Sequence, residues 1–159
     1  MTSTTRILVI VGAAGTGLVA GALFVFSAFV MPALDRIGGR QAITAMQSIN
    51  RLAVTAPFMI AFLGTALVSV ALAVLSVTSF DEPASRYQLL AAVLYLATFV
   101  ITAAYHVPRN DALGLADPAA ADAGAVWSAY SGGWTAMNHV RTATALAAST
   151  LLTVSTRIG

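Results

Sequence analysis

An uncharged apolar stretch, ILVIVGAAGTGLVAGALFVFSAFVM, runs from Ile7 to Met31 near the start of this 159-residue chain. A helix needs about 20 apolar residues to cross the hydrocarbon core of a bilayer, so this stretch is long enough to span it. Because that core holds no water to satisfy backbone N–H and C=O groups, an open chain crosses it only as an α-helix. We therefore predict a transmembrane helix over residues 7–31.

Three further apolar stretches, over about 52–80, 88–105 and 139–156, are of similar length and character. A hydrophobic fraction of 58% with only 9% charged residues lies outside the range of soluble domains. A signal peptide followed by a globular domain is excluded, because the first run is too long and others follow it. The predicted fold is an all-α, four-helix integral membrane bundle, a single domain over residues 1–159 that crosses the cell membrane several times.

The composition excludes several functions. Eight arginines against six acids give a net charge of +2, too slight for a nucleic-acid surface. The absence of cysteine excludes disulfides, thiol redox chemistry and thiolate metal sites. The predicted spans carry no charged residue near their centres, which argues against a coupled transporter. We predict no nucleic-acid partner and no bound metal.

Four spans place both chain termini and the short 81–86 turn on one side of the membrane, and the connections 32–51 and 106–141 on the other. The long connections carry five arginines and the other side carries three, which favours a cytoplasmic location for the long connections. Without Arg109 and Arg141, each side carries three. We expect helical segments over 39–51 and over 119–130. The second would begin at Asp117-Pro118 and end at Gly132-Gly133.

Gly17 and Gly21 form a small-xxx-small pattern in the first span. Such a pattern lets another helix approach closely. We predict that both glycines contact a helix of the same chain, with homo-oligomerisation through the first span as the alternative.

Polar residues gather where the last span begins. Asn138 and Arg141 are three residues apart, so they share a helical face. If the span starts at Asn138, Arg141 lies in the first turn, where the helix dipole disfavours a cation. We therefore expect an anionic companion, namely Asp111, Asp35 or a bound anion. The alternative is an arginine that reaches the lipid headgroups.

His106 and His139 are predicted at similar depth on the same side of the membrane. They fit a base and its partner, two axial ligands of a haem or metal, or two unrelated interfacial histidines. Nearby aromatic residues suit either a headgroup-level belt or a substrate-facing wall. These rings are Trp127, Tyr130 and Trp134.

Four short motifs carry a resemblance to a known family. VMPAL ends the first span, AMQSIN precedes the second, VPRND follows the third and WTAMNHVRT begins the fourth. In this order and spacing they resemble the anthrone oxygenase-like membrane proteins. One departure is His106-Val107-Pro108, where family members often have Asn-Val-Pro.

The resemblance implies oxidation of a hydrophobic aromatic or polyketide-like substrate by O2, without a known cofactor. The reaction needs a base, a cation or donor set for an oxyanion, and a flat apolar pocket. His139 or His106 would be the base, and Arg141 with Asn138 would hold the oxyanion. The remaining predicted cavity residues are Trp134, Asn110, Gln47, Asn50 and Tyr130.

Two other functions stay open on the sequence. A noncatalytic subunit that binds lipid or a small molecule, or assists a membrane complex, predicts that Asn138, His139 and Arg141 face headgroups or a partner chain. A haem or metal electron carrier predicts that His106 and His139 face each other.

Overall fold

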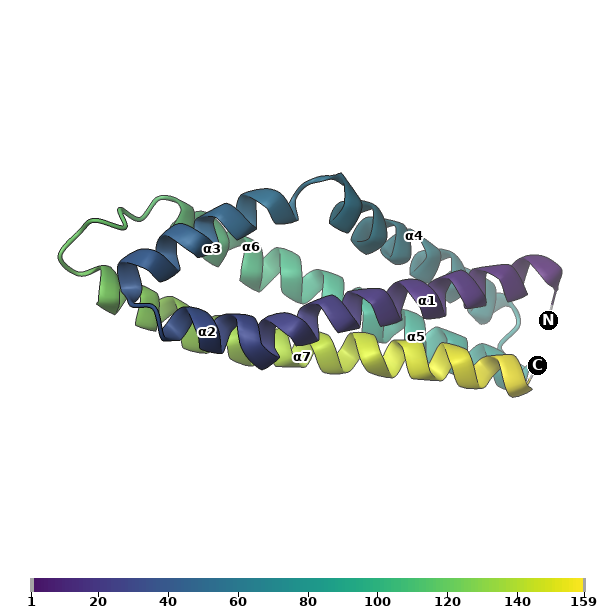
Figure 1. The fold of residues 1–159 in the computed structure, drawn as a ribbon. Coiled ribbons are helices and arrows are strands. Elements are labelled where there is room, and N and C mark those ends of the chain that lie inside the picture. Colours follow the sequence, from purple (N-terminus) through teal and green to yellow (C-terminus); the bar gives the residue numbers. More distant parts are fainter. Residues whose placement is uncertain (1, 159) are drawn as a thin grey trace.

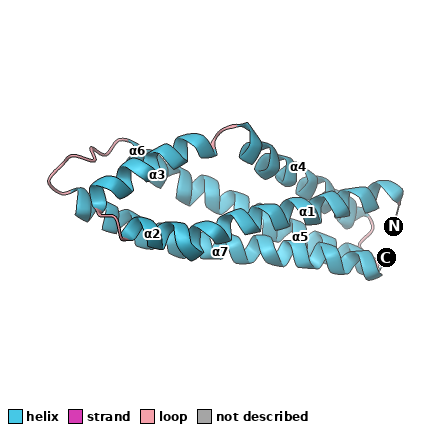
Figure 2. Cartoon of the chain, in the orientation of Figure 1, coloured by secondary structure: helices cyan, strands magenta, loops and turns pink. Residues whose placement is uncertain are grey.

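Every regular element in the part of the chain that the structure describes, residues 2–158, is a helix (Figure 2). The coordinates are those of a computed structural model. The all-α prediction is confirmed. The elements are α1 (Ser3–Val25), the π-helix η1 (Phe26–Val30), α2 (Met31–Asp35), α3 (Gly39–Ala53), α4 (Ala56–Thr78), α5 (Pro83–Ile101), the π-helix η2 (Thr102–His106), α6 (Val107–Gly114) and α7 (Ala123–Ile158).

The long helices run side by side along one axis (Figure 1). Helix α7 packs against α1 and α5, and α4 packs against the same two helices. Both chain ends lie at one end of the molecule, together with the α4–α5 turn. At the opposite end lie α3, α6 and the beginning of α7 (Figure 1). The long connections therefore gather at one end, as the sequence predicts.

Three helical segments are long and apolar enough to cross a membrane, judged by length and composition. They are Ser3–Asp35, Pro57–Thr78 and Pro83–Gly114. The fourth predicted span, 139–156, is part of α7. Its many serine and threonine residues lower its hydropathy relative to the other three.

Two prolines that we expected to follow spans lie inside continuous helices instead. A proline inside a helix lacks an N–H donor, and its ring clashes with the carbonyl four residues earlier. A π-helical turn precedes each of them: the Met31 amide bonds to Phe26 O before Pro32, and the Val107 amide bonds to Thr102 O before Pro108. These wider turns let each helix continue past its proline, and such turns often occur at functional sites.

The predicted helix over 119–130 is wrong in both its start and its end. Asp117 instead forms a turn, in which its Oδ1 accepts a hydrogen bond from the Ala119 amide at 2.8 Å. Helix α7 begins at Ala123 and continues through Gly132 and Gly133. Tertiary packing outweighs the low helix propensity of these glycines, since the aromatic residues on either side of them are buried. Arg141 therefore lies well inside a long helix, not in its first turn.

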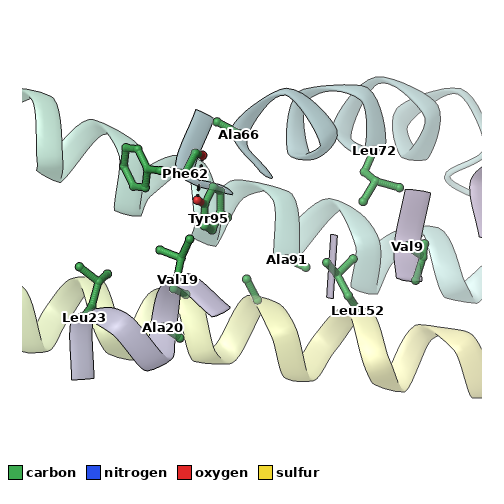
Figure 3. Close-up of a cluster of buried hydrophobic side chains, with 12 residues drawn as sticks. Val9, Val19, Ala20, Leu23, Phe62, Ala66, Leu72, Ala91, Tyr95 and Leu152 are labelled. Carbon is green, nitrogen blue, oxygen red and sulfur yellow. Dashed lines mark hydrogen bonds between the residues drawn. The ribbon is translucent and has the colours of Figure 1, made fainter. Parts of the chain in front are cut away.

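One apolar core joins the long helices at the end of the molecule that carries the termini. It includes Tyr95, which is fully buried and donates its hydroxyl hydrogen to Phe62 O at 3.0 Å (Figure 3). Val19 and Leu152 bring α1 and α7 into the same cluster. A second cluster, around Met31, Ile43 and Trp127, fills the opposite end.

The prediction for the glycines of the first span is confirmed for Gly17 and wrong for Gly21. A Cβ atom at Gly17 would lie 3.1 Å from Ser149 Oγ on α7, whereas one at Gly21 would meet nothing within 4 Å. Four residues turn a helix by about 400°, so Gly21 is rotated a further 40° or so away from the packed face. The closest approach to α4 is made by Gly15, where a Cβ would overlap Thr65 Oγ1.

Gly15→Ala is expected to destabilise the protein by about 1–3 kcal/mol, because the added methyl group overpacks the α1–α4 contact. Thr65 is buried and β-branched, so it has little freedom to move aside. Gly21→Ala is the matched control and should leave stability unchanged or slightly raised. Thermal unfolding in detergent measures both, and equal melting temperatures for the two variants would contradict the prediction.

Candidate functional site

A cavity of about 570 Å³ lies between α1, α3, α4, the α5–η2–α6 segment and α7. This volume is within the roughly 300–1,000 Å³ typical of small-molecule sites. Most of its wall is apolar, and five polar side chains also line it. These are Asn50, Thr102, His106, Asn110 and Arg141, with Trp134 beside them.

Arg141 is the only charged residue among those that line the cavity within the described chain. Its side chain is 5% exposed. Nη1 donates to Thr102 Oγ1 at 3.2 Å, Nη2 donates to Asn138 Oδ1, and Nε has no hydrogen-bond partner among the described residues. The guanidinium carbon lies 5.5 Å from the centre of the Trp134 ring.

The expected carboxylate companion of Arg141 is absent from the described residues, so that prediction is wrong for the protein without ligand. Asp35 accepts a hydrogen bond from Trp127 Nε1 at 2.7 Å, and Asp111 is exposed on α6. The helix-dipole argument also fails, because Arg141 is not in a first turn. A buried cation with only neutral partners is costly, and an anionic ligand in the cavity would offset that cost.

Asn138 is fully buried and connects Arg141 to the first π-helix. Its Nδ2 donates to Leu23 O at 2.7 Å and to Ser27 Oγ at 2.5 Å, and its Oδ1 accepts from Arg141. Thr102, on the second π-helix, holds the other side of the guanidinium. Arg141 is thus fixed between the two π-helical turns, and Asn138 supports it from outside the cavity lining.

Asn138→Leu is expected to lower stability by several kcal/mol, since loss of each buried partner costs about 1–3 kcal/mol. The change removes the partners of Ser27 and Arg141 while nearly keeping side-chain volume. His139→Leu, at the exposed neighbouring position, is the control and should change stability by less than about 0.5 kcal/mol. Thermal unfolding compares the two, and an unfolding midpoint of Asn138→Leu equal to that of the control would exclude the structural role of Asn138.

His106 is buried at the end of η2, in an edge-to-face contact with the Trp134 ring. Its Nδ1 lies 3.5 Å from Ile101 O, and its Nε2 lies 3.3 Å from Trp134 O. A neutral imidazole carries only one N–H, so one of the two nitrogens keeps a lone pair that can take up a proton.

A hydrogen-bonded aromatic group forms the wall beside this histidine. Asn110 Oδ1 accepts from the Tyr130 hydroxyl at 2.8 Å and from Trp134 Nε1 at 3.0 Å. Burial raises the pKa of the Tyr130 phenol, so Tyr130 stays protonated and acts as a donor. Tyr130 itself does not line the cavity. Its role is to orient Asn110 and Trp134, which do.

The end of the cavity nearest the long connections is closed by packed helices. Gln47 Nε2 donates to Leu113 O and Ala116 O at 2.9 Å each, which joins α3 to the last turn of α6 and to the residues that follow it. At the start of α3, a Cβ on Gly39 would lie 2.6 Å from Gly124 Cα, so the two backbones cross at close range. Gln47 therefore closes the cavity instead of lining it.

The structure separates the two histidines. His139 is exposed on α7 and does not line the cavity, so the prediction that it faces a shared site with His106 is wrong. It is adjacent in sequence to Asn138, but the next position on a helix is rotated by about 100°. Among residues 2–158, no group of three or more His, Asp or Glu side chains could hold a metal ion.

The family model described as anthrone oxygenase matches residues 57–151, more than half of the chain. The chain belongs to the anthrone oxygenase family. The resemblance seen in the sequence is confirmed. No curated protein and no solved structure is significantly similar to the chain.

The region matched to the anthrone oxygenase family contains one side of the cavity. It includes His106, Asn110, Trp134, Asn138 and Arg141, and with them the VPRND and WTAMNHVRT motifs. VMPAL and AMQSIN lie outside the match. The sequence did not reveal the contribution of Ser27 and Thr102, because serine and threonine in an apolar span usually bond to their own helix.

Proposed function

We propose that this protein is a membrane-embedded oxidoreductase that uses O2 to oxidise a hydrophobic aromatic or polyketide-like substrate. The observation that carries the proposal is a buried arginine that lines an apolar cavity and contacts no carboxylate among residues 2–158. Such a site favours a ligand that is apolar over most of its surface and develops negative charge on one oxygen. Membership of the anthrone oxygenase family supports the reaction type.

The proposal includes a four-helix bundle that crosses the cell membrane four times, with 139–156 as the fourth span. The three strongly apolar helices support a membrane location. Helix α7 packs against both α1 and α5, so a membrane that contains those two helices would also surround this part of α7.

For an anthrone, the reaction begins when a base removes a proton from the CH2 group opposite the carbonyl. The charge moves onto the carbonyl oxygen. O2 then bonds to the deprotonated carbon, and the resulting peroxide anion takes up a proton to become a hydroperoxide. Loss of water, with the second hydrogen of that carbon, leaves the second carbonyl of an anthraquinone. One O2 thus supplies the new ketone oxygen and the oxygen of the water, and no other reductant is consumed.

His106 would be the base in this scheme, since it lines the cavity and His139 does not. Arg141, positioned by Asn138, would stabilise the oxyanion, and Trp134 would provide a flat wall. The buried positions of Asn138 and Arg141 do not fit a subunit that presents them to headgroups or to a partner. The separation of His106 from His139 likewise does not support facing haem ligands.

The test is oxygen consumption by the purified protein in lipid vesicles supplied with an anthrone. We expect O2 uptake and anthraquinone formation in a one-to-one ratio, well above the rate of spontaneous oxidation in protein-free vesicles. A rate equal to that of protein-free vesicles, for a series of anthrones that differ in ring substituents, would exclude the proposed reaction.

A further inference from the structure

The residues that line the cavity differ in exposure according to their chemistry. Those at its opening are apolar: Leu52 is 65% exposed, Val54 71%, Leu63 41% and Val107 45%, and Ala103 is exposed as well. The polar lining residues are buried or half-buried. The opening therefore lies between the α3–α4 junction with the start of α4 on one side and the η2–α6 junction on the other.

This opening faces the same surroundings as the apolar outer surface of α4. Ile60 and Leu67, one helical turn to either side of Leu63, are each 72% exposed. Every exposed residue of the lining is apolar, so these residues offer water no side chain with which to form a hydrogen bond at the opening. An exposed apolar rim that continues into an apolar helix surface indicates contact with lipid.

The route from the connection-rich end is blocked by a packed layer. Ile43 and Met46 of α3, Leu113 of α6 and Trp127 of α7 are buried there in one cluster. The contacts of Gln47 with α6 and of Gly39 with α7 close the same layer. A ligand that came from water at this end would have to open several packed contacts.

We propose that the cavity takes its ligand directly from the lipid phase, through the opening between the α3–α4 junction and the η2–α6 junction. The ligand class is a bilayer-dissolved, largely apolar molecule that carries an oxygen function at its leading end. That end reaches Arg141 and His106, and the trailing end remains among Leu52, Val54 and Leu63. The inference rests on the proposed membrane location and not on the oxidation.

This orientation determines at which end a substrate can carry large substituents. Substituents on the trailing end extend towards the acyl chains through the opening. Substituents beside the leading oxygen meet Trp134 and Asn110, whose positions are fixed by hydrogen bonds. The site thus accepts variation at the end of the ligand that enters last.

Fluorescence quenching tests the route without any substrate. Trp127→Phe leaves Trp134, which lines the cavity, as the only tryptophan, and Trp134→Phe leaves Trp127 in the closed layer. Each variant is reconstituted in phosphatidylcholine vesicles with or without brominated acyl chains, and aqueous iodide is added separately. We expect brominated lipid to quench Trp134 more strongly than Trp127, and iodide to quench Trp134 little.

A pair of neighbouring substitutions shows whether quenching occurs through the opening. Ala103 and Ala104 are both exposed on η2, but only Ala103 lines the cavity. Ala103→Phe should narrow the opening and reduce quenching of Trp134 by brominated lipid, whereas Ala104→Phe should leave it unchanged. The same two substitutions are also made in the parent protein, where the readout is the quenching of total tryptophan fluorescence, so the test does not depend on the folding of Trp127→Phe.

Stronger quenching of Trp134 by iodide than by brominated lipid would overturn the proposal, because the opening would then lead to water. Equal quenching in Ala103→Phe and Ala104→Phe would overturn it as well. The quenching experiment does not measure turnover, so its outcome is independent of the O2-uptake test. If the quenching is as expected but no O2 uptake is found, the lipid route is retained and the proposed oxidation is rejected.

Discussion

Arg141→Gln is expected to lower anthrone turnover by about 100- to 1,000-fold, the usual effect of removing one oxyanion donor. Glutamine keeps a hydrogen-bonding group at the position but removes the positive charge. In the structure this charge has no carboxylate partner among the described residues, so the developing oxyanion would be its main counter-charge. The measurement is O2 uptake in vesicles at saturating substrate, with the amount of folded, membrane-inserted protein determined for each variant.

Arg141→Lys separates charge from geometry. Lysine retains the charge but loses the planar arrangement of donors that bonds Thr102 and Asn138 at once. We expect activity between that of the parent and that of Arg141→Gln. Turnover by Arg141→Gln equal to that of the parent would show that this arginine has no role in the reaction.

His106→Gln is expected to lower turnover by about 100- to 10,000-fold, the range associated with loss of a general base. Glutamine can still donate a hydrogen bond to Trp134 O, so the change removes proton uptake more than it removes structure. If His106 acts by taking the substrate proton, replacement of the transferred hydrogen of the substrate by deuterium should slow the reaction that remains in His106→Gln. The measurement compares O2 uptake with protonated and deuterated anthrone.

His139→Gln is the matched control for this experiment. It makes the same substitution at the histidine that does not line the cavity. Its turnover should equal that of the parent. The reverse pattern, a loss at His139 with normal activity at His106, would mean that the reaction takes place outside this cavity.

Hydrophobic length and composition were enough to predict the all-helical fold. An apolar run of about 20 residues has few stable forms other than a helix in a bilayer. The same reasoning located α3, whose apolar residues recur at helical spacing. The motifs were short, but their order along the chain correctly indicated the anthrone oxygenase family.

Which face of each helix points towards the other helices depended on the tertiary structure. Gly17 and Gly21 look equivalent in the sequence, yet only Gly17 contacts another helix. Asn138 and His139 are neighbours, yet one is fully buried and the other exposed. In a helix that is apolar on most sides, hydropathy does not distinguish the face towards protein from the face towards lipid, because both are apolar.

The sequence by itself determined that the chain forms apolar helices and that its polar residues gather near one end, since both follow from local composition. Only the tertiary structure decided where those helices end and which polar residues meet. The π-helical turns before Pro32 and Pro108 continue two helices past the predicted span ends at residues 31 and 105. The same turns bring Ser27 and Thr102 towards α7, where Asn138 and Arg141 bond to them. These contacts join residues far apart in the chain, and their energies depend on packing between helices, which local sequence patterns do not encode.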